Sequence, residues 1–170
     1  MMDDDIRQAY TKTLKKDGIE IFTQAEVKSV KDNEVTYSFE GKDVKITADS
    51  ILVSVGMRPN SEGLDVLNLE KDRAAIKTNE HLQTSVKSVY AIGDVNGKYM
   101  LAHVASAEGI IAVEHIHGKK VKMDYTRVPN AVYGSPEIAT IGLTEKEVKK
   151  KKIPYKVSTF PLMASGKALA

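Results

Sequence analysis

The apolar positions near the amino terminus repeat with the period of a helix. Ile6, Tyr10 and Leu14 recur every four residues, which places their side chains on one face. Aspartates precede this run and suit the positive end of a helix dipole, while Gly18 is a residue type that commonly ends a helix. The pattern predicts a helix over residues 3–16.

The period then changes to that of strands. The run IEIFTQA (residues 19–25) predicts one strand. The short alternating runs KSV, EVTYSF and VKITA are separated by KDN and EGK, whose residues are typical of turns, so we expect a small antiparallel meander. The nearly continuous apolar run SILVSVG (residues 50–56) predicts a buried strand that ends at Gly56.

The centre of the chain predicts two further strands and a long helix. Residues 57–72 indicate a loop with one helical turn, and the runs AAIKTN (74–79) and SVYAIGD (88–94) predict strands. Residues 100–117 have helical spacing. Apolar residues occur almost all round that helix, which predicts that it is buried.

Beyond Gly118 the sequence becomes more polar. KKVKMDYTR predicts a linker, and VPNAVYGSPEIATIGL predicts two strands about a Gly-Ser-Pro turn. Thr144 and Glu147 have the spacing of a capping box at the start of a short surface helix. PYKVSTFPL predicts another strand, and the final residues MASGKALA predict no element.

Composition and charge narrow the classes of protein and partner. A chain of 170 residues suggests one or two domains, and its net charge of +2 gives no reason to expect a nucleic-acid or membrane partner. No apolar run approaches the roughly 18 residues that span a bilayer, and the acidic start MMDDD does not fit a secretory signal. We therefore expect a cytoplasmic protein. The absence of cysteine excludes a disulfide framework, a thiolate metal site and thiol chemistry within this chain.

Two predicted strand ends are candidate ligand sites. Glycine at Gly93 permits close backbone approach, and Asp94 can accept hydrogen bonds from ligand hydroxyls. The first amides of the following helix, near residues 100–102, carry the positive end of its dipole. The Gly-Asp pair is also an ordinary turn, which is the commoner outcome for that dipeptide alone. At Gly56 a loop that contacts a cofactor and a plain exit turn are evenly balanced.

The histidines and the lysine run do not predict further sites. His115 and His117 project to different sides of a helix, and no carboxylate or cysteine spacing completes a metal site with His103. The run KKKK (residues 149–152) predicts a solvated helix end rather than a nucleic-acid surface. The residues themselves therefore indicate an α/β chain with two loops suited to cofactors, and they leave the cofactor open.

Longer stretches of the sequence resemble a known family. TSVKSVYAIGDVNGKYMLAHVASAEG (residues 84–109) is similar to the flavin-dependent pyridine nucleotide–disulfide oxidoreductases. ADSILVSVGMRPN, VPNAVYGSPEIATIGLTEKE and PYKVSTFPLMASGKAL agree with that family in order and spacing, so the resemblance covers essentially the whole chain. MLAH and PEIATIGLTE resemble its dihydrolipoamide branch more than the glutathione or mercuric reductases.

The resemblance implies which residues bind FAD and NAD. The Asp of the IGD motif binds the ribityl chain of FAD, and it falls on Asp94. The MLAH segment contacts the flavin through the start of the helix, where reduced flavin carries negative charge. The NAD contacts fall on Val27 and Gly56, and the family often has Arg where this chain has Met57. The MLAH residues are Met100, Leu101, Ala102 and His103.

The resemblance also implies the fold class. We expect an α/β chain with partial doubly wound, Rossmann-like FAD- and NAD-binding domains, followed by the start of an α+β dimerisation domain. Residues 1–62 would be the second half of the NAD-binding domain and residues 63–122 the returning part of the FAD-binding domain. Residues 123–170 would begin the dimerisation domain.

Activity is likewise implied for a longer parent protein. That protein would be a homodimeric flavoenzyme that passes electrons from dihydrolipoamide through a protein disulfide and FAD to NAD. Its partner would be the lipoyl domain of a 2-oxoacid dehydrogenase or glycine cleavage complex. The family's redox cysteine pair, Gly-rich fingerprints and His–Glu base have no counterpart here, so we assign no catalytic residue. We expect an inactive middle third of the enzyme. Another disulfide reductase of the family and a non-enzymatic binding or assembly module remain alternatives.

Overall fold

The computed structural model describes residues 2–169, which form two compact units. One unit comprises the residues up to Glu20 together with those from Pro129 onward, and the other comprises Ile21–Val128. In the described part of the chain, no helix has both the length and the apolar character needed to cross a bilayer.

The first unit contains the predicted amino-terminal helix. Helix α1 spans Asp4–Lys16, with acidic residues in its first turn and lysines in its last, so its charges oppose the helix dipole favourably. Gly18 follows with φ of +84°, and its amide donates to the Lys15 carbonyl, while the Asp17 amide donates to the Thr13 carbonyl. The predictions of this helix and of its glycine stop are confirmed.

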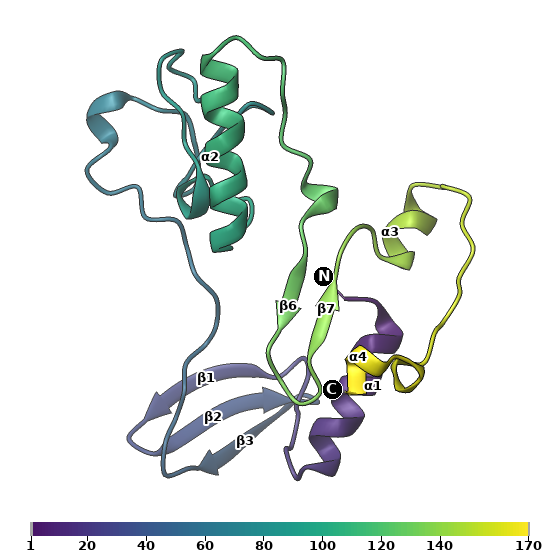
Figure 1. Ribbon diagram of the computed structural model, residues 1–170. Coiled ribbons are helices and arrows are strands. Elements are labelled where there is room, and N and C mark those ends of the chain that lie inside the picture. The colour runs from purple at the N-terminus through teal and green to yellow at the C-terminus, as the bar shows by residue number, and fades with distance from the viewer. Residues whose placement is uncertain (1, 170) are drawn as a thin grey trace. The chain divides into compact units, whose positions relative to one another are not determined.

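The carboxyl-terminal part of this unit holds a hairpin and short helices. Strands β6 (Asn130–Val132) and β7 (Ile138–Thr140) pair antiparallel about the Gly-Ser-Pro turn, as predicted (Figure 1). Helix α3 (Glu145–Lys150) begins with the predicted capping box, because Thr144 and Glu147 each hydrogen-bond the other's backbone amide. A 3₁₀ turn η4 (Leu162–Ala164) and helix α4 (Gly166–Leu169) follow.

One predicted strand of this unit is wrong. PYKVSTFPL has no strand in the structure, and the residues from 151 to 160 are exposed. An alternating sequence forms a strand only where a neighbour supplies its backbone hydrogen bonds. Within the described residues, the only sheet of this unit consists of β6 and β7, and it has no third strand.

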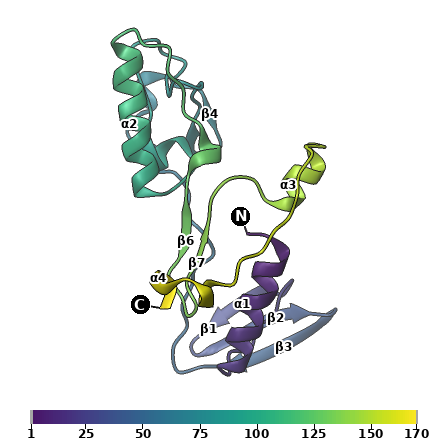
Figure 2. The ribbon, with the colours of Figure 1, turned by 45° about the vertical axis from the view of Figure 1, so that its right-hand side comes forward.

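The second unit begins with the predicted meander. Strands β1 (Glu26–Lys31), β2 (Glu34–Phe39) and β3 (Lys42–Thr47) pair antiparallel, with β2 in the middle (Figures 1 and 2). Tyr37 is buried at the centre of this sheet. IEIFTQA does not add a strand, so that prediction is wrong. Instead, the ring centroid of Phe22 lies 5.6 Å from that of Tyr37 and 5.4 Å from that of Phe39.

The apolar run SILVSVG is also not a strand in this structure. Residues 51–60 are extended without ladder pairing, and the side chains of Leu52 and Val55 are each 90% exposed. A strand buried on both faces needs neighbouring strands and covering helices, and no described element pairs with this run. The predicted burial of this strand is therefore wrong for the structure.

The remainder of the second unit surrounds a small core. Leu69, Ile76 and Ala91 pack together, and Leu82 is fully buried. The predicted strand AAIKTN shortens to β5, and SVYAIGD shortens to one bridge between Gln83 and Tyr90. The elements are η1 (Asp65–Leu67), β4 (Lys71–Asp72), β5 (Ala75–Ile76), η2 (Gly93–Asn96), α2 (Ala102–Ile116) and η3 (Tyr125–Arg127).

Helix α2 confirms the predicted long helix but not its all-round burial. Val104, Glu108 and Ala112 are buried at intervals of four residues, which defines one inward face. The apolar side chains of Ile110 and Val113 remain more than half exposed. The apolar residues on the outer face therefore have no described element packed over them.

Candidate functional site

The junction between η2 and α2 contains all five residues predicted to bind FAD. Gly93 is buried and has φ of +71°, a conformation that favours glycine. A Cβ at this position would lie 3.1 Å from the Cβ of Ala105, so a side chain would crowd α2. Asp94 is exposed, and within residues 2–169 its carboxylate makes no hydrogen bond. The turn thus presents Asp94 outward from a closely packed backbone.

A buried glutamate holds both ends of this turn. Glu108 is 0% exposed and lies on the inward face of α2. Its Oε2 accepts hydrogen bonds from the Gly93 amide at 2.6 Å and from Asn96 Nδ2 at 2.9 Å. Its Oε1 accepts a hydrogen bond from the Tyr125 hydroxyl at 2.5 Å. Buried charge is tolerated where hydrogen bonds satisfy it, and here both carboxylate oxygens have donors.

Tyr125 binds the Glu108 oxygen that does not bind the turn. Burial, and then the hydrogen bond and negative charge of Glu108, raise the pKa of the Tyr125 hydroxyl far above its usual value. The Tyr125 ring stacks on Tyr99 with centroids 5.1 Å apart. Lys98 Nζ lies 5.6 Å from the Tyr125 ring centroid. Burial lowers the pKa of Lys98, against the opposing effect of Glu108.

Asn96 and Gly97 complete the turn. Asn96 Oδ1 accepts the Lys98 amide at 2.9 Å, and the Gly97 amide donates to the Asp94 carbonyl at 3.0 Å. Gly97 has φ of +68°, and a Cβ there would lie 2.7 Å from the Cβ of Ala75. Substitution of Gly97 would therefore require backbone movement. The loop from η2 to α2 is thus fixed by its own hydrogen bonds as well as by Glu108.

The start of α2 adds a second feature suited to an anion. Leu101 is the N-cap residue, and its side chain caps no amide of the first turn. Its carbonyl accepts hydrogen bonds from the amides of Val104 and Ala105. The helix is 15 residues long and has no acidic residue in its first turn. The positive end of its dipole is therefore not neutralised by a side chain of that turn.

The structure brings together five of the seven predicted cofactor-binding residues. Asp94 and the MLAH residues lie on one loop and the helix that follows it, with Met100 and Leu101 partly buried and Ala102 and His103 exposed. Val27 is exposed on β1, which pairs with β2 at the edge of the meander. Gly56 has φ of +108° and open space around it. Val27 and Gly56 therefore do not join the cluster at the α2 junction.

Sequence reasoning missed Glu108, the residue that organises the junction. A charged residue is usually exposed, and the burial of Glu108 depends on donors that only the folded chain brings to it. One signal was available: Glu108 lies four residues from both Val104 and Ala112, so it shares their face. Three donors from outside the helix confirm that this face is inward.

The histidines contribute to structure in a different place. His115 stacks on His81 with ring centroids 4.4 Å apart, and His115 Nδ1 lies 2.7 Å from the Tyr90 hydroxyl. His117 Nδ1 lies 2.9 Å from the Val113 carbonyl. In the described part of the chain, no group of His, Asp and Glu residues has the arrangement of a metal site.

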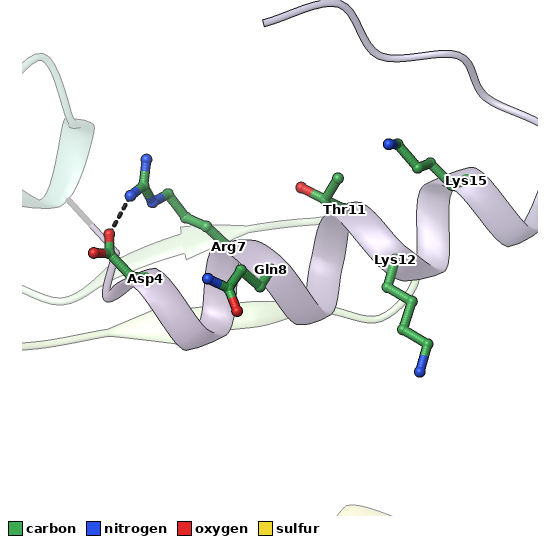
Figure 3. Close-up of a pocket in the computed structure, with 6 residues that line it drawn as sticks. All are labelled: Asp4, Arg7, Gln8, Thr11, Lys12 and Lys15. Atoms are coloured by element: carbon green, nitrogen blue, oxygen red, sulfur yellow. Dashed lines mark hydrogen bonds and ion pairs between the residues drawn. The ribbon is translucent and has the colours of Figure 1, made fainter.

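A hollow of about 540 Å³ on helix α1 is not part of this junction (Figure 3). Its lining side chains all come from α1, and an ion pair joins Arg7 to Asp4 within it. A binding site usually encloses its ligand with groups from several elements. The side chains in Figure 3 extend from one exposed helix instead, so we do not assign this hollow a function. They are Asp4, Arg7, Gln8, Thr11, Lys12 and Lys15.

Comparisons with known proteins identify relatives along the whole chain. Residues 1–109 match the family described as pyridine nucleotide-disulphide oxidoreductase, and residues 128–170 match the dimerisation domain of that family. A dihydrolipoyl dehydrogenase of Acholeplasma laidlawii is 70% identical over 115 residues, which cover 68% of this chain and 34% of the relative. The dihydrolipoyl dehydrogenase of Bacillus subtilis is 44% identical over 165 residues, covering 92% of this chain and 35% of the relative. The chain spans about a third of the length of these curated relatives.

Solved structures share the fold. LpdA from Mycobacterium tuberculosis has a TM-score of 0.84 at 24% identity, covering 99% of this chain and 38% of that protein. The HOCl-induced flavoprotein disulfide reductase RclA from Escherichia coli has a TM-score of 0.77 at 22% identity, covering 97% of this chain and 39% of that protein. The partial α/β fold expected from the motifs agrees with these neighbours. With a family match over 109 of its 170 residues, the chain belongs to the pyridine nucleotide-disulphide oxidoreductase family.

Proposed function

We propose that these residues are the central part of a flavin-dependent dihydrolipoamide dehydrogenase and carry parts of its FAD and NAD sites. The observation that carries this proposal is the junction of η2 and α2, where Asp94 is exposed on a turn held by Glu108. The relatives named dihydrolipoyl dehydrogenase support the substrate class. The dimerisation-domain match supports a homodimeric parent enzyme.

The residues at the junction fit the chemistry of FAD. The Asp94 carboxylate has both oxygens available to accept hydrogen bonds from the ribityl hydroxyls, because no described group occupies them. Gly93 allows the turn to pack against Ala105 without a side chain between them. The start of α2, from Met100 to His103, would stabilise negative charge on a reduced flavin through its dipole. Bound FAD would accept electrons from a dithiol–disulfide pair and deliver them to NAD.

We assign NAD to the other two predicted residues on the same family grounds. Gly56 has a positive φ and open space around it, which suits close approach of a ligand to the backbone. Val27 is exposed on β1 and offers an apolar surface. Residues 1–62 would then belong to an NAD-binding domain, residues 63–122 to an FAD-binding domain and residues 123–170 to a dimerisation domain.

The proposed partners follow from the proposed substrate. Dihydrolipoamide is carried by the lipoyl domain of a 2-oxoacid dehydrogenase or glycine cleavage complex, so such a domain would be the partner of the parent enzyme. We propose a cytoplasmic location. This chain has no cysteine, so the redox-active pair of the enzyme would come from outside these residues.

The test is an assay of the full-length polypeptide that carries this chain. We expect bound flavin in its absorbance spectrum and reduction of NAD with dihydrolipoamide as the electron donor. Oxidised glutathione with NADPH is the comparison reaction, and activity with it instead would favour another disulfide reductase of the family. A natural polypeptide with the 18.7 kDa mass of this chain and no flavin would favour a binding or assembly module.

A further inference from the structure

The turn that carries Asp94 has both of its ends bound to one carboxylate oxygen. Gly93 and Asn96 are the first and last residues of η2, and both donate to Glu108 Oε2. Asp94 lies between these anchors. The backbone of Asp94 is therefore anchored through the residue before it and through the Asn96 side chain two residues after it.

The second oxygen of Glu108 has a different partner. Oε1 accepts the Tyr125 hydroxyl, which belongs to η3 and comes 17 residues later in the chain. The two oxygens thus divide the contacts of Glu108. One side holds the Asp94 turn, and the other holds the segment that leads out of this unit.

We propose that Glu108 is a positioning residue for FAD binding, acting through the Gly93 amide and the Asn96 side chain to hold Asp94 toward the flavin. The inference rests on the proposed function and adds a residue that does not itself contact the cofactor. Loss of Oε2 would leave the buried Gly93 amide without its acceptor, and Asn96 Nδ2 would keep its 3.4 Å bond to the Ala91 carbonyl and lose the shorter one to Glu108. The turn would then be free to adopt other conformations, and Asp94 would meet the ribityl hydroxyls less often.

Glutamine provides a matched test of this geometry. In Glu108→Gln the amide oxygen can keep both bonds at the Oε2 position, while the amide nitrogen donates to the Tyr125 hydroxyl, which is able to accept. Glu108→Ala removes the acceptor altogether. Tyr125→Phe removes only the Oε1 partner and leaves the Oε2 bonds to the turn intact. The three variants therefore separate the positioning contact from general packing.

The experiment measures FAD affinity, flavin absorbance and apoprotein melting temperature in the full-length protein. We expect Glu108→Ala to raise the Kd for FAD at least about tenfold and to change the flavin spectrum. We expect Glu108→Gln to stay within about threefold of the unaltered protein, a difference below 1 kcal/mol. Tyr125→Phe should lower the melting temperature and leave the Kd within the same threefold.

Other outcomes would overturn the inference or the function on which it rests. Glu108→Ala that melts earlier but binds FAD with unchanged Kd and spectrum would show a structural role only. If Glu108→Ala does not fold, Glu108→Gln that folds and loses FAD as severely as Asp94→Ala would also contradict the proposed geometry. Asp94→Ala with unchanged FAD affinity, or an unaltered protein without flavin, would contradict the proposed FAD site itself.

Discussion

At the scale of single residues, Gly93 shows how backbone conformation and packing act together. Its φ is +71°, and an added Cβ would lie 3.1 Å from the Cβ of Ala105. Gly118 has a similar φ of +85° with open space around it. The two glycines therefore share the conformational constraint, and only Gly93 adds a packing constraint.

We expect Gly93→Ala to lower the free energy of unfolding more than Gly118→Ala. Both substitutions place a side chain in the left-handed region, at a cost of about 1 kcal/mol or more. Gly93→Ala additionally requires Ala105 to move, which adds to its cost. Urea unfolding of the chain with each substitution measures the difference. Equal losses at the two positions would show that contact with Ala105 has no energetic effect.

A second prediction at this scale concerns Tyr125 and alkaline pH. Its pKa is raised in the folded chain, first by burial and then by Glu108, above the ordinary value of 10.0. The folded state therefore binds the phenol proton more tightly than the unfolded state. Tyr125 makes its full contribution to the free energy of unfolding below about pH 10, and this contribution is lost as pH rises further. Tyr125→Phe should make the decline in melting temperature above pH 10 shallower. Tyr133→Phe is the control, because Tyr133 is 88% exposed and its phenol is not buried.

At the scale of elements, local patterns predicted local structure. The four-residue period of Ile6, Tyr10 and Leu14 predicted α1, and the spacing of Thr144 and Glu147 predicted the start of α3, because both depend on contacts within one turn or the next. The meander and the β6–β7 hairpin were predicted for the same reason, since tight turns bring neighbouring runs together.

The strand predictions that were wrong share one physical cause. IEIFTQA, SILVSVG, SVYAIGD and PYKVSTFPL have strand-like composition, but composition does not identify the neighbour that completes a backbone ladder. The sequence pattern did not predict the burial of Glu108, because the donors that satisfy its carboxylate are distant in the sequence. Family motifs predict Asp94 and the start of α2 as FAD contacts, whereas the burial of Glu108 against the Asp94 turn could be found only from the fold.

The two faces of α2 give a prediction with a built-in control. Val104 is 1% exposed on the inward face, whereas Val113 is 54% exposed on the outer face. Val104→Ala should lower the free energy of unfolding by about 1–3 kcal/mol, because it removes buried methyl groups and leaves a cavity. Val113→Ala should change it by less than about 1 kcal/mol. Urea unfolding curves for the two variants measure this difference, and equal effects would contradict the assigned inward face.

At the scale of the whole molecule, large apolar side chains are exposed in several places, and two of these belong to the second unit. The run from Leu52 to Met57 is extended with exposed apolar side chains, and α2 exposes Ile110, Val113 and Ile116. Exposed patches of this kind mark surfaces that other polypeptide covers, or they cause association. The chain also spans only about a third of its curated relatives, at 34% and 35% of their lengths. We therefore infer that further residues of a longer enzyme cover these surfaces.

This inference predicts how the 170-residue chain behaves alone. We expect it to bind a hydrophobic fluorescent dye strongly and to self-associate with rising concentration, because Leu52 and Val55 are each 90% exposed. Replacing both with serine should reduce dye fluorescence and association with little loss of stability, since neither side chain is packed. The same two substitutions in the full-length protein should destabilise it, because there the side chains would be buried. Dye titration, sedimentation velocity and thermal unfolding measure these effects. A full-length protein that tolerates both serines as well as the isolated chain does would show that this run stays exposed in the enzyme.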